Sequence, residues 1–146
     1  MKNRTVSVTI GFVIFFGILL GALLILAPGL ARWYVNMRAM PPELGTVILV
    51  SFYICCPPAA AALLCVFRLL SNIRRDQTFC TDNTRLMTFI SWCCLTVSAI
   101  TFGAAFWYTP FFFITGAMLF IFLIVRVVRS CFLAAIDLKE ENSLTI

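Results

Sequence analysis

The sequence predicts an all-α integral membrane protein with four transmembrane helices, arranged as an antiparallel up-down bundle of two hairpins with both termini cytoplasmic. Apolar residues make up 62% of the 146 residues and charged residues only 12%. Three stretches, 5–31, 44–67 and 86–125, contain no Asp, Glu, Lys or Arg. A membrane span needs about 20 apolar residues and must satisfy its own backbone hydrogen bonds, so each stretch is predicted to cross a bilayer as helix.

The third stretch is 40 residues long, about twice one span, so we predict that it folds back on itself. Pro110 marks the break, because a proline disfavours the helical conformation in the residue before it. The fourth helix is expected to continue past Arg126 and Arg129, whose long side chains can reach the lipid boundary. The chain is thus predicted to be a single membrane domain, with helices at about 6–28, 44–70, 84–107 and 111–136, a cytoplasmic loop at 71–83 and a cytoplasmic tail at 137–146.

The first two helices each carry one specific feature. Gly17 and Gly21 of the first helix have a spacing that lets another helix approach closely, and small-residue faces of this kind allow a homo-oligomer. Pro57 and Pro58 remove backbone donors near the middle of the second helix, so we expect a kink there. Broken membrane helices can hold ligands, but no charged side chain lies at this depth, which favours a plain bend.

Small and polar side chains form one continuous stripe along the third helix. They recur at steps of three and four residues, which places them on one helical face: Thr84, Thr88, Ser91, Cys94, Ser98 and Thr101. We expect this face to contact protein through small side chains and hydroxyl hydrogen bonds. The alternative is a polar groove for a small ligand, which is disfavoured because no charged residue joins the stripe.

The positions of the basic residues predict the orientation of the helices, because lysine and arginine favour the cytoplasmic side. An N-terminus inside the cell leaves only Arg32 and Arg38 outside. Both Trp33-Tyr34 and Trp107-Tyr108 then lie at the outer interface, where amphipathic rings prefer to sit. We therefore expect a multi-pass protein of the bacterial inner membrane. Its cytoplasmic basic residues would be Lys2, Arg4, Arg68, Arg74, Arg75, Arg85, Arg126, Arg129 and Lys139.

The chain has 7 cysteines and no histidine. Most of the cysteines fall within predicted helices and none lies in the outer loop, which argues against structural disulfides. The alternative is a Cu(I) site formed by the pairs Cys55-Cys56 and Cys93-Cys94 on neighbouring helices. Adjacent residues on a helix point about 100° apart, so each pair offers one good inward ligand. Packing in lipid is therefore the favoured interpretation, and we expect neither a metal nor a cofactor.

The loop and the tail contain the most distinctive segments. Segment 79–86 (FCTDNTRL) follows the second helix, with Thr81 as a candidate N-cap and Asp82 in the first turn of the third helix. The tail 137–146 (DLKEENSLTI) changes abruptly to acidic residues and ends on an apolar tip. In these segments, and in its four helices with cytoplasmic ends, the chain resembles the bacterial membrane-protein family known as domain of unknown function 2975.

The resemblance implies no chemistry, because the family has no assigned activity. Its genes often lie beside one for a small helix-turn-helix DNA-binding protein, which implies a regulatory unit at the membrane. We therefore expect the chain to tether or regulate such a transcription regulator at the cytoplasmic face. The candidate partner-binding residues are Arg74, Arg75, Phe79, Asn83, Arg85, Glu140, Glu141, Leu144 and Ile146.

The alternative function is immunity or stress protection, in which the helices shield the bilayer or a receptor from a toxin. A small transporter is disfavoured, because no charged side chain lies in the membrane and no repeat relates the two hairpins. An enzyme is not expected, since a cysteine nucleophile would have no evident base. Direct binding to nucleic acid is not expected either, because topology accounts for the net charge of +5.

Overall fold

The protein consists of four long α-helices. The computed structural model describes residues 2–75 and 81–144. Its helices are α1 (Lys2–Met37), α2 (Pro42–Arg74), α3 (Thr81–Ala105) and α4 (Phe111–Leu144). All four are long and apolar enough to cross a membrane, and the described residues contain no strand. The prediction of an all-helical protein with four helices of membrane-spanning length is confirmed.

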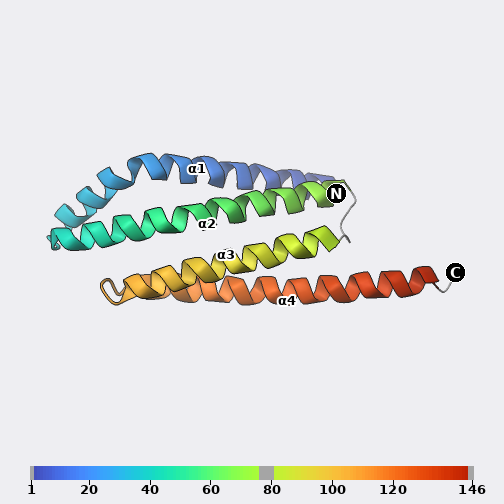
Figure 1. The fold of residues 1–146 in the computed structure, drawn as a ribbon. Helices are drawn as coiled ribbons and strands as arrows, with labels where there is room; N and C mark the ends of the chain where they lie inside the picture. The colour runs from blue at the N-terminus through green and yellow to red at the C-terminus, as the bar shows by residue number, and fades with distance from the viewer. Residues whose placement is uncertain (1, 76–80, 145–146) are drawn as a thin grey trace.

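The helices lie side by side in a row, in the order of the chain (Figure 1). α1 packs on α2, α2 on α3 and α3 on α4, and no other pair of helices packs together within the described ranges. Successive helices run in opposite directions, so the start of α1 and the end of α4 lie at the same end of the molecule, measured along the helix axes (Figure 1). We call this end the terminal end. The opposite end, which holds the turns 38–41 and 106–110, is the turn end.

Most of the apolar surface of this row faces outward. In the most apolar window of α1 and of α4, 0% of the residues are buried within protein, compared with 33% for α3. Large side chains such as Phe12, Ile25 and Phe113 are exposed. Such an extended apolar surface requires apolar surroundings, which a lipid bilayer provides.

Helix α1 runs through Pro28 and ends at Met37, well beyond the predicted boundary. A proline inside a helix lacks the N–H that would donate to the carbonyl four residues earlier, here that of Leu24. The Tyr53 hydroxyl of α2 donates to this Leu24 carbonyl oxygen at 3.0 Å. A side chain of the neighbouring helix thus replaces the missing backbone donor, which explains why α1 can continue.

The turn between α1 and α2 has a defined hydrogen-bonding pattern. The Met40 N–H donates to the Val35 carbonyl at 3.1 Å, and the Ala39 N–H donates to the Asn36 carbonyl at 3.3 Å. This is the pattern of a Schellman cap, whose left-handed position is taken by Ala39 with a φ of 48°. Beyond the turn, Gly45 lets α2 approach α1, because a Cβ there would lie 3.0 Å from Val35 Cγ2.

The polar stripe of α3 is buried or partly buried along its length. Near the turn end, the stripe forms hydrogen bonds with α4. The Thr101 and Thr115 hydroxyls lie 2.9 Å apart, and the Ser98 hydroxyl donates to the Thr115 carbonyl at 3.3 Å. Elsewhere in the stripe, Ser91 donates to carbonyls of its own helix. The expectation that this face packs against protein is therefore confirmed, and hydroxyl bonds between helices occur where α3 meets α4.

Helices α2 and α3 are joined near the terminal end by an amide pair. Asn72 Nδ2 donates to Asn83 Oδ1 at 2.9 Å. Between this pair and the turn end, α2 remains helical through Pro57 and Pro58.

The predicted packing face of α1 is not used within the described chain. A Cβ added at Gly17 or Gly21 would meet nothing within 4 Å. Gly17 lines a hollow between α1 and α2 together with residues such as Ala60 and Leu63, so the two helices do not pack closely at this position.

Candidate functional site

The predicted partner-binding residues that the structure describes lie at the terminal end. Those with exposed side chains, at the end of α2, the start of α3 and the end of α4, are Arg74, Arg75, Arg85, Glu140 and Glu141. Phe79 and Ile146 lie outside the described residues. Leu144 is the last residue of α4, and its side chain is not among those that the structure describes.

Asn83 differs from the other candidates because it lies inside the protein. Its side chain is 0% exposed, and it accepts the hydrogen bond from Asn72. Amide side chains often link membrane helices in this way. Asn83 therefore joins α3 to α2, and a partner would reach its side chain only if the two helices separated.

A hollow of about 640 Å³ opens between α2 and α3 at the terminal end. Its lining contains two arginines and one aspartate, so we call it the basic hollow. Guanidinium groups recognise carboxylates and phosphates through paired hydrogen bonds, so this lining suits an acidic group. The lining residues are Cys65, Arg68, Asn72, Asp82, Arg85, Leu86 and Phe89.

Helix α4 extends beyond its neighbours at the terminal end. The Thr101–Thr115 hydrogen bond sets the register of the antiparallel helices α3 and α4. Thr81, which begins α3, is therefore level with about residue 135 of α4. From there α4 continues to Leu144, roughly 13 Å farther at 1.5 Å per residue. Figure 1 shows α4 projecting past the ends of α2 and α3; we call residues 136–144 the α4 overhang.

The α4 overhang is predominantly acidic. Its charged residues are Asp137, Lys139, Glu140 and Glu141, and all four side chains are exposed. The overhang and the basic hollow thus present opposite charge at the same end of the molecule.

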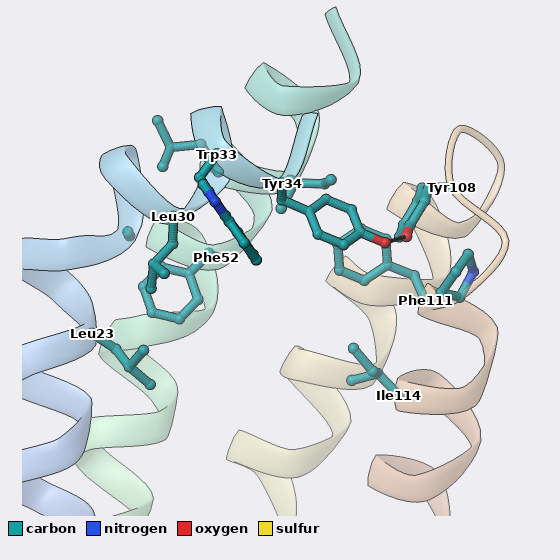
Figure 2. A pocket seen from close by; sticks show the side chains of 13 residues that line it. Leu23, Leu30, Trp33, Tyr34, Phe52, Tyr108, Phe111 and Ile114 are labelled. Carbon is teal, nitrogen blue, oxygen red and sulfur yellow. Dashed lines mark hydrogen bonds between the residues drawn. The ribbon is translucent and has the colours of Figure 1, made fainter. Parts of the chain in front are cut away.

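A second hollow, of about 460 Å³, lies at the turn end between the two hairpins. We call it the turn-end pocket. Figure 2 shows Leu23, Leu30 and Phe52 on one side and Phe111 and Ile114 on the other. The pocket is lined by apolar and aromatic side chains: Leu23, Ala27, Leu30, Ala31, Trp33 and Tyr34 of α1, Ile48, Leu49 and Phe52 of α2, and Tyr108, Pro110, Phe111 and Ile114.

Two tyrosines connect the hairpins across this pocket. The hydroxyls of Tyr34 and Tyr108 hydrogen-bond to each other (Figure 2), and their rings meet edge to face with centres 6.5 Å apart. The hydrogen bond with Tyr34, aided by partial burial, raises the pKa of Tyr108, and the charge of Arg38 opposes this effect. The guanidinium carbon of Arg38 lies over the Tyr34 ring, 5.8 Å from the ring centre.

The structure also bears on the cysteine pairs considered for Cu(I). The Asn72–Asn83 bond sets the register of α2 and α3, so Cys56 is level with about residue 99, roughly 8 Å along the axis from Cys94. The two pairs therefore do not lie opposite each other. Within the described ranges, no group of three or more potential metal ligands occurs, and the six cysteines found there are free.

A comparison with protein families shows which family the chain belongs to. The sequence model of a family described as "Protein of unknown function (DUF2975)" matches residues 31–146. The chain belongs to this family. The DUF2975 match begins near the end of α1 and covers the basic hollow, the α4 overhang and both tyrosines of the turn-end pocket. The resemblance seen in the loop and tail is confirmed, whereas searches of curated proteins and of solved structures gave no match.

Sequence reasoning did not find the turn-end pocket of this DUF2975 protein. It treated Trp33-Tyr34 and Trp107-Tyr108 as separate lipid anchors at one interface. The sequence did contain one indication of the contact, because two tyrosines predicted at the same depth in the membrane can form a hydrogen bond between their hydroxyl groups. A direct Tyr34–Tyr108 bond follows from that principle once the hairpins are placed side by side.

Proposed function

We propose that this protein is a multi-pass protein of the bacterial inner membrane that tethers or regulates a small helix-turn-helix transcription regulator at its cytoplasmic face. The observation that carries the proposal is the α4 overhang, an acidic helical extension beyond the membrane-spanning row. The resemblance to the DUF2975 family, whose genes often lie beside one for such a regulator, supplies the expected class of partner.

In this proposal the terminal end faces the cytoplasm. Of the eleven Lys and Arg residues, seven lie in helix ends and segments at the terminal end, Arg126 and Arg129 lie near the middle of α4, and Arg32 and Arg38 lie near the turn end. Segments on the cytoplasmic side of membrane proteins carry an excess of positive charge. The charge distribution therefore supports cytoplasmic N and C termini.

The chemistry of the α4 overhang suits a DNA-binding partner. Such a protein presents a basic surface to DNA phosphates, and Asp137, Glu140 and Glu141 offer negative charge that competes for the same surface. Exposed ion pairs contribute only about 0 to 1 kcal/mol each. Apolar docking of Leu144 and Ile146 is therefore expected to supply most of the affinity, as buried anchors do in protein interfaces.

Affinity purification from native membranes in mild detergent tests this proposal. The full-length protein is expected to bring down the helix-turn-helix protein, and a variant lacking residues 140–146 is not. Combined Leu144→Asp and Ile146→Asp is expected to lose the partner as well. A matched control, Asn142→Asp with Ser143→Asp, adds the same charge but keeps the apolar tip, so it should retain the partner. Undiminished recovery with the Leu144→Asp, Ile146→Asp protein would show that the docking mechanism is wrong.

The second candidate function is immunity or stress protection through the helices themselves. It is favoured by the outward apolar faces of α1 and α4, which contain no buried residue in their most apolar windows and are free to contact other molecules within the bilayer. This function predicts that cells lacking the protein become sensitive to a membrane-active agent. It also predicts that a variant without residues 140–146 protects as well as the full chain, which distinguishes it from regulator tethering.

We further propose that the chain is not an enzyme, uses no metal or cofactor and does not bind nucleic acid directly. It has no histidine, and a cysteine nucleophile within the apolar helices would lack a base. A homo-oligomer would use the small-residue positions Gly17 and Gly21, where a Cβ meets nothing within 4 Å.

A further inference from the structure

The turn-end pocket lies in the space between α1 and α4. α1 and α4 form opposite walls of the pocket, yet these two helices do not pack on each other anywhere in the described ranges. The hydrogen bond between Tyr34 and Tyr108 spans the gap at the turn end, and Figure 2 shows the apolar walls continuing from it toward Leu23 and Ile114. An unfilled apolar space of this kind loses dispersion contacts, so a molecule from the hydrocarbon is favoured to fill it.

The rim of the same pocket is polar and positively charged. The two tyrosine hydroxyls meet there, and the Arg38 guanidinium lies 5.8 Å from the centre of the Tyr34 ring. Moving along the helices toward the turns, an apolar cavity is therefore followed by hydroxyls and then by a cation. A phospholipid has complementary groups in the same order: an acyl chain, then ester and glycerol oxygens, then an anionic phosphate.

We propose that the turn-end pocket binds one acyl chain of an anionic phospholipid from the surrounding leaflet, with the lipid phosphate at Arg38 and its ester oxygens near Tyr34 and Tyr108. The pocket volume of about 460 Å³ lies within the range of about 300–1,000 Å³ typical of ligand sites. Binding at this end of the row is independent of the α4 overhang, so it does not rest on the tethering function.

Arg38 rather than Arg32 is assigned to the phosphate. Arg32 lies at the same end of α1 but lines a different hollow together with Pro28, Val35 and Gly45. The turn-end pocket is lined instead by positions such as Leu30 and Tyr34, which lie on another side of α1. The two arginines thus have equal charge, and only Arg38 is placed against Tyr34, which lines the pocket.

Quenching of Trp33 fluorescence measures this binding, because Trp33 lines the pocket. Trp92→Phe and Trp107→Phe leave Trp33 as the only tryptophan of the three in the chain. The protein is reconstituted into phosphatidylcholine bilayers that contain increasing fractions of phosphatidylglycerol or phosphatidylcholine with brominated acyl chains. The quenching curves give the relative binding constant of the two lipids.

Phosphatidylglycerol is expected to bind about fivefold more tightly than phosphatidylcholine, the effect of one basic residue at a membrane surface. Arg38→Gln is expected to reduce this ratio to about one, whereas Arg32→Gln leaves it near fivefold. Ala27→Phe places a ring in the pocket and should weaken quenching by both lipids. A ratio of one in the parent protein, or equal losses for Arg32→Gln and Arg38→Gln, would overturn the proposal. The two arginine variants change only exposed side chains, so the test stands even if Ala27→Phe does not fold.

Discussion

The hydrogen bond from the Tyr53 hydroxyl to the Leu24 carbonyl gives the sharpest test of how this row of helices is stabilised. The carbonyl has lost its helical donor to Pro28, and no water is present in the hydrocarbon to replace it. Tyr53→Phe removes the hydroxyl while keeping the ring. The perturbation therefore isolates one donor to one carbonyl, 3.0 Å away in the structure.

The expected magnitude follows from hydrogen bonds between membrane helices, which contribute about 0.6 kcal/mol on average and up to about 1.7 kcal/mol. Because the Leu24 carbonyl has no backbone donor at residue 28, we expect a value in the upper part of this range. Tyr53→Phe should therefore lower the free energy of unfolding by about 1 to 1.5 kcal/mol.

A double-mutant cycle with Pro28→Ala separates this contact from other effects of the substitutions. The alanine would supply the missing N–H, so the loss caused by Tyr53→Phe should nearly vanish in the Pro28→Ala background, which gives a coupling free energy of about 1 kcal/mol. Equilibrium unfolding in mixed micelles of a mild and a denaturing detergent, followed by circular dichroism, measures all four proteins. An equal loss in both backgrounds would refute the reasoning that Tyr53 replaces the donor removed by Pro28.

Three further predictions concern the turn end. Ala39→Gly should raise the free energy of unfolding by about 0.5 to 1 kcal/mol, because Ala39 has a φ of 48° and glycine adopts that conformation without strain; a loss in the same unfolding assay would contradict this. Gly45→Ala should lower the free energy of unfolding by about 1 kcal/mol, because the added methyl group would crowd Val35. An unchanged unfolding midpoint would show that the two helices adjust freely. The Tyr34 hydrogen bond raises the pKa of Tyr108, so the unfolded chain releases that proton first and stability should fall as the pH rises above about 10. Tyr34→Phe should show a smaller fall over this range, and identical pH profiles would exclude the Tyr34 bond as the cause.

The number of helices could be predicted from the sequence because charges separate three apolar runs, and the length of the third run, together with Pro110, indicates a fold-back. The ends of α1 and α4 could not be predicted. Local rules end α1 near Pro28, but a tertiary contact from Tyr53 supports the chain beyond it. The predicted end of α4 followed the hydrophobic run to residue 136. Leu, Lys and Glu in the segment after Asp137 are good helix formers, so the helix continues through Leu144 although its apolar face has ended.

The candidate sites were predictable to different degrees. The sequence alone brought the arginines and the acidic tail to one end, because alternating spans fix which segments share a side of the membrane. It did not indicate that Asn83 is buried against Asn72, since a polar residue in a predicted loop reads as exposed until the register of α2 and α3 is known. The turn-end pocket depends on the separation of α1 from α4, which no local pattern encodes.

The most direct test of regulator tethering is the distribution of the proposed helix-turn-helix partner between membrane and cytosol in cells with and without this chain. Tethering predicts that the regulator sediments with membranes when the full-length protein is present, and becomes cytosolic when the chain is absent or lacks residues 140–146. A regulator that stays cytosolic in cells whose membranes contain the full-length protein would contradict regulator tethering.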